Sequence, residues 1–234
     1  MNKIIIALMG LVLSLGASEI YATFSVQATK SASLAFDASG IVNKVNFDIS
    51  AHVKKGALLA VLANADKKAN LESAKTALKY AKKDYDRQVK VKKLIDAGKF
   101  DAYAFKYENA KNQLAFQQSM YNKTFLRSPF DGVVFFKNIE VGDTVSGVSL
   151  KTVYQIQSKK SRKLVLDFDQ KYHKVVKVGN KFKYKIDGDA KEYVGVISKI
   201  YPSVNTNNRK IQAEVKVNYL MVGLFGDGYI TTTK

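Results

Sequence analysis

The chain has 234 residues, with 38 Lys and Arg against 20 Asp and Glu, and it contains no Cys. This length permits one to three small modules, and a hydrophobic fraction of 47% is typical of a folded protein. The lack of Cys excludes disulfides, thiolate metal sites, a Cys nucleophile and lipid attachment through an N-terminal cysteine.

The first residues have the plan of a secretory signal peptide. Lys3 supplies a positive charge, residues 4–15 form an apolar run, and Gly16-Ala17-Ser18 supplies small residues. The run is shorter than the ~20 residues that a membrane-spanning helix needs. We expect a signal peptide over residues 1–22, cleaved near Ser18 or Ala22, and an uncleaved N-terminal anchor is the alternative. No later segment is apolar enough to cross a membrane, so the remainder is expected outside the cytoplasm.

Residues 66–97 are predicted to form a long helix with a narrow apolar seam. The segment lacks Pro and Gly, and seam residues recur at steps of three and four, as in a coiled coil. They are Leu71, Ala74, Leu78, Ala81, Tyr85, Gln88, Lys92 and Ile95. Eleven basic and four acidic residues between Lys67 and Lys99 are spread around the helix. We interpret them as a solvated face rather than a polyanion site.

A break at residues 97–100 separates this helix from a second one. Gly98 is placed to cap the end of the first helix, and Asp101 can cap the start of the second. The second seam is Phe100, Tyr103, Tyr107, Ala110, Leu114, Gln117, Tyr121 and Thr124, and it ends before Pro129. Two matching seams predict an antiparallel hairpin over residues 64–126, with an arm of about 45 Å. A helical pair packed on a globular core is the alternative.

The segments on either side of the hairpin resemble each other at a constant offset of 92 residues. The equivalent pairs are Gly40 with Gly132, Val42 with Val134, Ile49 with Val141, and Val53 with Val145. Each copy is a pair of short β runs with a turn marked by Gly. Neither copy can bury its apolar face alone. We therefore expect residues 39–63 and 127–156 to form one split β-sandwich, although chance similarity of two β-hairpins is the alternative.

Short β runs with polar turns follow Lys163, at residues 164–168, 181–186, 193–200, 211–217 and 228–232. They predict a small closed or half-closed barrel over residues 23–38 and 157–234. An early strand at residues 21–26 or 33–36 would complete it. The expected fold is thus an elongated α+β chain: a split sandwich, an inserted helical hairpin and a barrel.

This order of modules resembles the periplasmic adaptor family, also called membrane fusion proteins, and among them most the RND-type efflux adaptors. The half-sandwiches look like the halves of a lipoyl domain. In the sandwich, the resemblance rests on residues 53–60, 126–134 and 141–145. In the barrel, it rests on residues 195–202, on Asn205, Thr206 and Arg209, and on residues 220–225.

The resemblance implies a non-enzymatic periplasmic adaptor, associated with the inner membrane and not lipidated. Such a protein forms a homo-oligomer, usually a hexamer, between an inner-membrane transporter and an outer-membrane channel. The transporter would be of the RND type rather than the ABC type. A type I secretion adaptor and a non-enzymatic coiled-coil protein of the cell envelope are the alternatives. Export also argues against nucleic acid as a partner, despite the formal charge of +18.

In this family the hairpin tip carries Arg, then Leu four residues on, then Ser seven further, and this motif meets the channel. The matching positions here are Lys90, Leu94 and Asp101, of which only Leu94 is identical. Together with Gly98, they are the residues expected to bind the outer-membrane channel.

Two further departures from the family pattern concern the sandwich and the end of the chain. Ser50-Ala51 stands where the first half usually has Gly and an acidic residue, which puts the conformation of that turn in doubt. The sequence ends at Lys234, just after the barrel. The family's membrane-proximal domain is therefore expected to be absent, and docking on the transporter would rest on the barrel and the sandwich.

No sequence motif indicates catalysis, a cofactor or a metal. Phosphate-loop, dinucleotide and nucleophile-elbow motifs are lacking, which leaves an unrecognised hydrolase as a remote third class. His52 and His173 are far apart and are expected at the surface. Met1, Met9, Met120 and Met221 do not cluster, which argues against a Met-rich copper site. Asp84 and Asp86 lie on the solvated arm.

Overall fold

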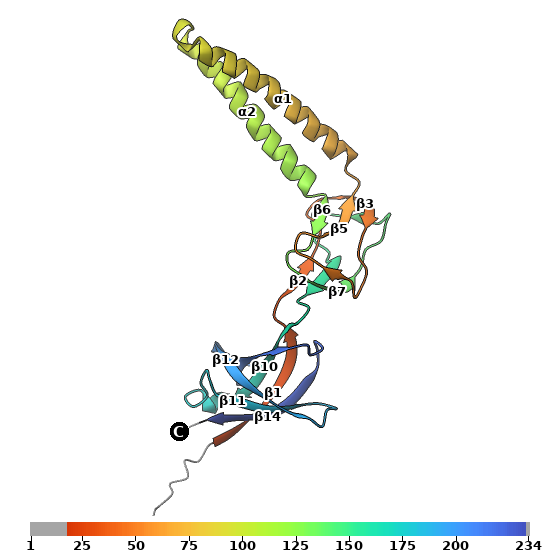
Figure 1. Ribbon diagram of the computed structural model, residues 1–234, viewed down its shortest axis with the longest axis vertical. Coiled ribbons are helices and arrows are strands. Elements are labelled where there is room, and N and C mark those ends of the chain that lie inside the picture. Colours follow the sequence, from red (N-terminus) through yellow and green to blue (C-terminus); the bar gives the residue numbers. More distant parts are fainter. Residues whose placement is uncertain (1–17, 233–234) are drawn as a thin grey trace, which may run out of the picture. The chain divides into compact units, whose positions relative to one another are not determined.

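The structure of the protein is a computed structural model that describes residues 18–232. It contains two compact units, of which one comprises residues 18–30 and 160–232 and the other residues 31–159. The first unit is a β-barrel, and the second is a β-sandwich that carries two long helices (Figure 1). The predicted α+β class with a split sandwich, an inserted hairpin and a barrel is confirmed.

Six strands close the barrel in the order β1-β10-β13-β12-β11-β14. They are β1 (Ser18–Ala28), β10 (Ser161–Asp169), β11 (Lys181–Ile186), β12 (Glu192–Asn205), β13 (Lys210–Asn218) and β14 (Phe225–Thr232). All neighbouring strands are antiparallel. A short 3₁₀ helix, η2 (Gln170–Tyr172), follows β10. Closure of the barrel leaves no strand edge unpaired.

Alternate residues of each strand fill the barrel interior. Strand β1 buries every second residue from Ile20 to Val26, because successive side chains of a strand point to opposite faces. The ring of Phe24 lies edge-to-face against Phe182 and Tyr184, at centroid distances of 5.9 and 5.2 Å. Aromatic rings prefer this arrangement because the edge of one is attracted to the face of the other.

The barrel begins at Ser18, whereas the sequence analysis predicted that it begins at residue 23. Ile20 and Ala22 are buried in its core, and Tyr21 packs edge-to-face on Tyr229 at 5.8 Å. The alternation of apolar residues simply continues toward the N-terminus beyond the expected boundary. Of the two cleavage positions considered, only the one near Ser18 leaves β1 intact. The rest of the predicted signal peptide, residues 1–17, lies outside the described residues.

Two four-stranded sheets form the sandwich, in the orders β2-β9-β7-β4 and β6-β5-β3-β8. The strands of the first sheet are β2 (Ser31–Leu34), β4 (His52–Val53), β7 (Gly132–Lys137) and β9 (Tyr154–Gln157). Those of the second are β3 (Gly40–Val45), β5 (Leu58–Leu62), β6 (Phe125–Arg127) and β8 (Thr144–Val145). Both sheets contribute to one core, in which Leu59, Leu62, Val134, Tyr154 and Ile156 are fully buried.

The two halves of the sequence repeat pair with each other. Strand β3 of the first half pairs with β8 of the second, and β7 of the second half pairs with β4 of the first. Gly40 lies opposite Val145 and Gly132 lies opposite Val53, so the offset of 92 residues converts one pair into the other. Each half therefore supplies strands to both sheets. This explains why the sandwich needs both halves and why the hairpin can be inserted between them.

Residues 31–38 belong to the sandwich, whereas the sequence analysis predicted that they belong to the barrel. Strand β2 pairs with β9, with Ala32 opposite Ile156, and Phe36 is buried in the sandwich core. Gln157, which was predicted to belong to the barrel, is likewise part of the sandwich, because it is the last residue of β9. The reason is that β1 already pairs with both β10 and β14, so the closed barrel has no edge left for a further strand.

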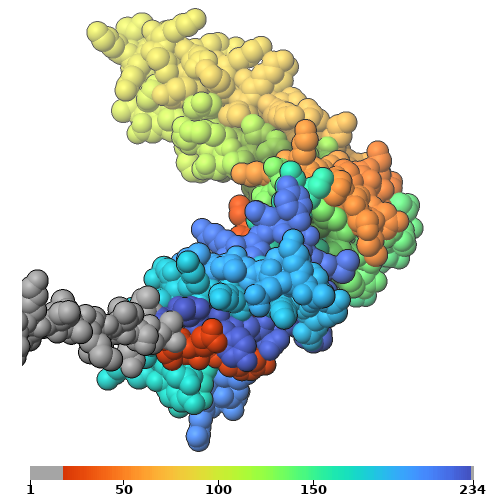
Figure 2. Space-filling view, turned by 60° about the horizontal axis from the view of Figure 1, so that its bottom comes forward, coloured from red at the N-terminus to blue at the C-terminus, as the bar shows by residue number. Residues whose placement is uncertain are grey.

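Two helices, α1 (Ala65–Lys90) and α2 (Ala97–Asn122), form the hairpin between β5 and β6. Figure 2 shows them in contact along their length, in yellow and yellow-green. Every predicted seam position except Lys92 is buried or half-buried, whereas most other positions are exposed. A helical pair packed on a globular core would bury a second face, which these helices lack. Among the described helices, none is long and apolar enough to cross a lipid bilayer.

Candidate interaction site at the hairpin tip

The four residues predicted to bind a partner lie where the chain turns from α1 into α2, a segment that we call the tip (residues 90–101). Helix α1 ends at Lys90, a 3₁₀ helix, η1 (Lys92–Leu94), follows, and α2 begins at Ala97. The break therefore lies at residues 91–96, and not at residues 97–100 as predicted. The difference arises because η1 turns the chain early, and Ile95 is extended with φ −115° and ψ 155°.

Asp96, and not Asp101, caps helix α2. Its carboxylate accepts a hydrogen bond from the backbone amide of Lys99 at 3.1 Å, and its carbonyl accepts one from the amide of Phe100 at 3.1 Å. A carboxylate at this place also interacts favourably with the positive end of the helix dipole. Gly98 consequently lies in the first turn of α2 and does not cap α1, while Asp101 is exposed on the helix surface.

An aromatic cluster supports the tip from inside the hairpin. Tyr85 of α1 stacks on Tyr107 of α2 with ring centroids 5.2 Å apart, and its ring lies 5.7 Å from that of Phe100. The ammonium of Lys92 lies 4.5 Å from the centroid of Phe100, within the range of a cation–π interaction. These contacts connect η1 to both helices. Lys92, the exposed member of the seam, thus still packs on the aromatic cluster.

The outer surface of the tip combines an apolar residue with positive charge. The side chain of Leu94 is 86% exposed, and Val91 is exposed beside it. Lys90 and Lys93 are exposed too. Among residues 18–232, no carboxylate lies within ion-pair distance of either lysine. An exposed apolar residue next to unpaired charges is the composition of a small docking surface, which fits a partner that is apolar and acidic.

Part of the charge on the remainder of α1 is paired within the helix. Three ion pairs one turn apart join Glu72 to Lys75 at 2.8 Å, Lys82 to Asp86 at 2.7 Å, and Asp84 to Arg87. Because all three pairs are exposed, each contributes little to stability. Asp84 and Asp86 have a structural explanation in these pairs.

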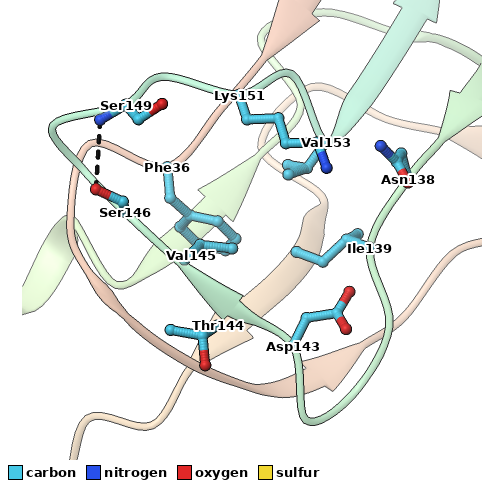
Figure 3. Close-up of a pocket in the computed structure, with 10 residues that line it drawn as sticks. All are labelled: Phe36, Asn138, Ile139, Asp143, Thr144, Val145, Ser146, Ser149, Lys151 and Val153. Carbon is cyan, nitrogen blue, oxygen red and sulfur yellow. Dashed lines mark hydrogen bonds between the residues drawn. The ribbon is translucent and has the colours of Figure 1, made fainter.

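A second candidate binding feature is a cavity of about 370 Å³ in the sandwich (Figure 3). Phe36, Ile139, Val145 and Val153 form its apolar lining, and Asn138, Asp143, Thr144, Ser146, Ser149 and Lys151 supply polar groups. The loop at residues 146–151 forms one wall. The hydroxyl of Ser146 accepts a hydrogen bond from the amide of Ser149 at 3.3 Å, drawn as the dashed line in Figure 3.

The residues that could carry metal or proton chemistry are dispersed. His52 lies in β4, and His173 follows η2, where its Nδ1 is 3.1 Å from the carbonyl oxygen of Gln170. Within the described part of the chain, no group of three or more His, Asp or Glu side chains is arranged to hold a metal ion. Met120 lies in α2 and Met221 in the barrel unit, whereas Met1 and Met9 lie outside the described residues.

Sequence reasoning missed two features of these sites. The first is the cap at Asp96, which an Asp directly before a run of helix formers could have indicated. The second is the loop at residues 146–151. Its Ser146-Gly147 pair indicates a turn, but no local pattern shows that the loop walls a cavity.

Known proteins are similar to this chain in sequence and in fold. The family model of the CzcB-like, barrel-sandwich hybrid domain matches residues 30–157. The cobalt-zinc-cadmium resistance protein CzcB of Cupriavidus metallidurans is 28% identical over 125 residues, which cover 46% of this chain and 24% of that protein. The chain thus matches about a quarter of the length of this curated relative.

Two solved structures illustrate the likeness in fold. A MacA–MexA chimera, which contains the MexA α-hairpin domain of Pseudomonas aeruginosa, superposes with a TM-score of 0.83 at 20% identity, covering 92% of this chain and 81% of the chimera. The membrane fusion protein Spr0693 of Streptococcus pneumoniae R6 superposes with a TM-score of 0.72 at 15% identity, covering 92% of this chain and 99% of that one.

Proposed function

The chain belongs to the CzcB-like barrel-sandwich hybrid family of membrane fusion proteins, and from this membership we propose that it is the adaptor subunit of a bacterial efflux system. In this role it links an inner-membrane transporter, of the RND type rather than the ABC type, to an outer-membrane channel. It works in the periplasm as a non-lipidated homo-oligomer, a hexamer in our proposal. It catalyses no reaction.

The observation that carries this proposal is the form of the hairpin. Its two helices of 26 residues each bury one seam and leave the remaining surface in water. At 1.5 Å per residue, each helix is about 40 Å long. Ordering so many residues for a narrow buried stripe gains little stability. Such an arm is instead well suited to reach a distant partner, which is what a connector between two membranes requires.

We propose that the tip is the part of the arm that meets the channel. Leu94 would enter an apolar notch of the channel, and the unpaired charge of Lys90 would face carboxylates around it. Gly98 has no side chain that could hinder close approach to the first turn of α2. Asp101 adds an exposed carboxylate one turn further along the helix. The exposed fraction of Leu94 and the absence of ion pairs at Lys90 among the described residues support this assignment.

The relative named for cobalt, zinc and cadmium resistance suggests which cargo to test first. We propose that the efflux system served by this chain removes divalent transition-metal cations. A strain without the chain should then become sensitive to these cations. Sensitivity to organic drugs with unchanged metal tolerance would contradict this choice of cargo while leaving the adaptor role intact.

Recovery of the membrane partners tests the adaptor role directly. The tagged full chain would be cross-linked in cells of its host and purified from membranes, and the bound proteins would be identified by mass spectrometry. We expect an RND transporter and an outer-membrane channel. An ABC transporter in their place would indicate a type I secretion adaptor. If no membrane protein were recovered, a structural role in the cell envelope would replace the adaptor role.

A further inference from the structure

The loop that connects η2 to β11, which we call the basic loop (residues 173–180), exposes two valines next to lysines at one end of the barrel. Val178 is 61% exposed and Val175 is 40% exposed. Lys174 and Lys177 are exposed as well. The loop therefore combines aliphatic side chains with positive charge on one surface, a composition that is typical of a contact surface.

The basic loop is held on the barrel by a buried valine and by backbone hydrogen bonds. Val176 is 4% exposed and belongs to the barrel core. Its amide and that of Val175 both donate to the carbonyl of Tyr172, at 3.0 and 2.9 Å. The amide of Gly179 donates to the carbonyl of Ile197 at 2.9 Å. The loop therefore presents its exposed side chains from a fixed backbone.

Positive charge predominates around the basic loop. Residues 169–181 and 203–210 contain six Lys or Arg and a single carboxylate, Asp169. The two segments adjoin, since the amide of Gln170 donates to the carbonyl of Arg209 at 3.1 Å. The carboxylate of Asp169 lies 3.9 Å from the ammonium of one of the six cations. The exposed cations that form no ion pair among residues 18–232 are Lys174, Lys177, Lys181 and Arg209.

The first strand of the barrel starts at this same end. Thr231, near the end of β14, lies opposite Lys181 of β11 and opposite Glu19 of β1. The start of β1 is therefore two strands from the end of the basic loop (Figure 1). In the sequence, the apolar run at residues 4–15 ends shortly before β1. A bilayer that receives this run, during export or as its anchor, would be next to the basic loop.

We propose that the basic end of the barrel, which comprises residues 170–181 and 203–210, binds the surface of a bilayer that contains anionic phospholipids. Lys174 and Lys177 face the phosphate groups, which attract exposed lysines. Val175 and Val178 enter the boundary between the headgroups and the acyl chains. The occupant is a bilayer rather than an acidic protein because the apolar run before β1 brings this end of the barrel to a membrane. The inference rests on the proposed location of the chain beside the inner membrane.

Vesicle binding by the purified full chain tests the charged part of this surface. Vesicles of phosphatidylglycerol and phosphatidylethanolamine would be compared with vesicles of phosphatidylcholine by co-sedimentation. We expect the parent to prefer the anionic vesicles, and Lys174→Glu/Lys177→Glu to bind them at least about tenfold more weakly, since each lysine near an anionic surface contributes about fivefold. Lys54→Glu/Lys55→Glu makes the same change of charge at exposed positions of the sandwich and should bind like the parent.

The comparison isolates the basic end from the rest of the chain. Every variant retains residues 4–15, so any affinity of this apolar run for lipid is the same in all of them. Equal losses in the two double variants would overturn the proposal, because the effect would then follow from net charge alone. A parent chain that binds neutral vesicles as tightly as anionic ones would overturn it too.

Substitution of Val178 tests the apolar part of the surface. Val141→Ser is the matched control for Val178→Ser, because Val141 is 63% exposed on the sandwich and both valines directly precede a glycine with positive φ. Val178→Ser should weaken binding to the anionic vesicles about fivefold, and Val141→Ser should not change it. Thermal unfolding of both variants should stay within about 2 °C of the parent. Unchanged vesicle binding by Val178→Ser would refute the insertion of the loop.

Recovery of the membrane partners distinguishes a lipid contact from a protein contact. If Lys174→Glu/Lys177→Glu lost the transporter in cells but bound vesicles like the parent, the basic end would be a protein contact and the proposal would fail. The adaptor function has its own test, because the parent chain either recovers a transporter and a channel or does not. A failure of vesicle binding therefore leaves the adaptor function untouched.

Discussion

Ser50 and Gly142 have the same left-handed backbone conformation at equivalent turns of the two sandwich halves. Their φ angles are 70° and 96°. The amide of Ser50 donates to the carbonyl of Val134 at 2.8 Å, and the amide of Gly142 donates to the carbonyl of Val42 at 2.9 Å. The turn at Ser50-Ala51 therefore does not differ from its counterpart, although it lacks glycine. The paired hydrogen bonds impose the conformation on both.

Exchanges at these two turns should change stability in opposite directions. Ser50→Gly should raise the free energy of unfolding by about 0.5 kcal/mol, because glycine adopts a positive φ without steric cost. Gly142→Ala should lower it by about 1 kcal/mol. A Cβ on Gly142 meets nothing within 4 Å, so backbone strain alone is responsible. Urea unfolding measures both values, and an unchanged Gly142→Ala protein would contradict the assignment.

Gly132 and Gly40, which are equivalent in the repeat, should differ sharply in their tolerance of alanine. A Cβ on Gly132 would lie 2.5 Å from the carbonyl oxygen of Gln157, and the sheet backbone cannot move aside easily. A Cβ on Gly40 would be in ordinary contact with Leu62 at 3.5 Å. Gly132→Ala should therefore cost about 2–3 kcal/mol of unfolding free energy and Gly40→Ala much less. Similar losses for the two variants would argue against the β7–β9 packing.

Substitution of Leu94 tests whether the tip binds the channel. Leu94→Ser should abolish efflux and recovery of the channel, while helical content, abundance and transporter binding stay near those of the parent. An exposed leucine contributes little to folding, so its loss should be felt only by a partner. Phe116→Ser, which changes a 56% exposed residue on the shaft of α2, is the matched control and should be active. Full resistance from an abundant Leu94→Ser protein would end the docking assignment.

The aromatic cluster should determine how firmly the tip is held. Tyr85→Ala removes the stack on Tyr107 and the contact with Phe100, and we expect a loss of about 2 kcal/mol in the stability of the hairpin. Tyr80→Ala is the control. Tyr80 is exposed, and among the described residues its ring interacts with two lysine ammonium groups and with no other aromatic ring. Amide hydrogen exchange along α1 and α2 measures the effect: Tyr85→Ala should lower the protection of the amides, and Tyr80→Ala should not. Equal protection in both variants would show that the cluster is dispensable.

A polar network on the barrel should make its stability depend on acid. Lys163 and Tyr201 each donate a hydrogen bond of 2.6 Å to the carboxylate of Glu214. Partial burial tends to raise the pKa of Glu214, but the hydrogen bonds from Lys163 and Tyr201 outweigh it and hold the pKa below its ordinary value of 4.5. A lowered pKa in the folded state stabilises the protein above pH 4.5, and this contribution is lost as the pH falls through the folded-state pKa.

Glu214→Gln should therefore be less stable than the parent at pH 7, by about 1–2 kcal/mol. The difference should shrink as the pH falls below 4.5. Unfolding free energies measured between about pH 3 and pH 7 check this. Glu192→Gln, at an exposed position of the same barrel, should show no such effect. A Glu214→Gln deficit that is independent of pH would contradict the network.

Several structural elements could be predicted because they leave local periodicities in the sequence. The seam that runs through Leu71 and Tyr85 repeats every three to four residues, which only a helix can place on one face. Barrel strands such as Lys181–Ile186 alternate with a period of two. The offset that relates Gly40 to Gly132 was visible because both copies must make the same turn and the same strand pairing.

Boundaries and surfaces depended on contacts between segments that are distant in the sequence. Residues 31–38 belong to the sandwich because β1 pairs with both of its neighbours and closes the barrel without them. No local sequence pattern indicates this closure. The break at the tip lies at residues 91–96, and not at the predicted residues 97–100, because η1 and the ring of Phe100 pack together across the turn.

The sequence by itself thus determined the modules of this protein and their order, since each depends on a repeat or a period along the chain. Only the tertiary structure decided that Leu94 and Val148 remain in water and that the loop at residues 146–151 forms one wall of a cavity. Exposure of an apolar residue depends on what the rest of the chain fails to cover, and this is a property of the folded surface and not of any segment.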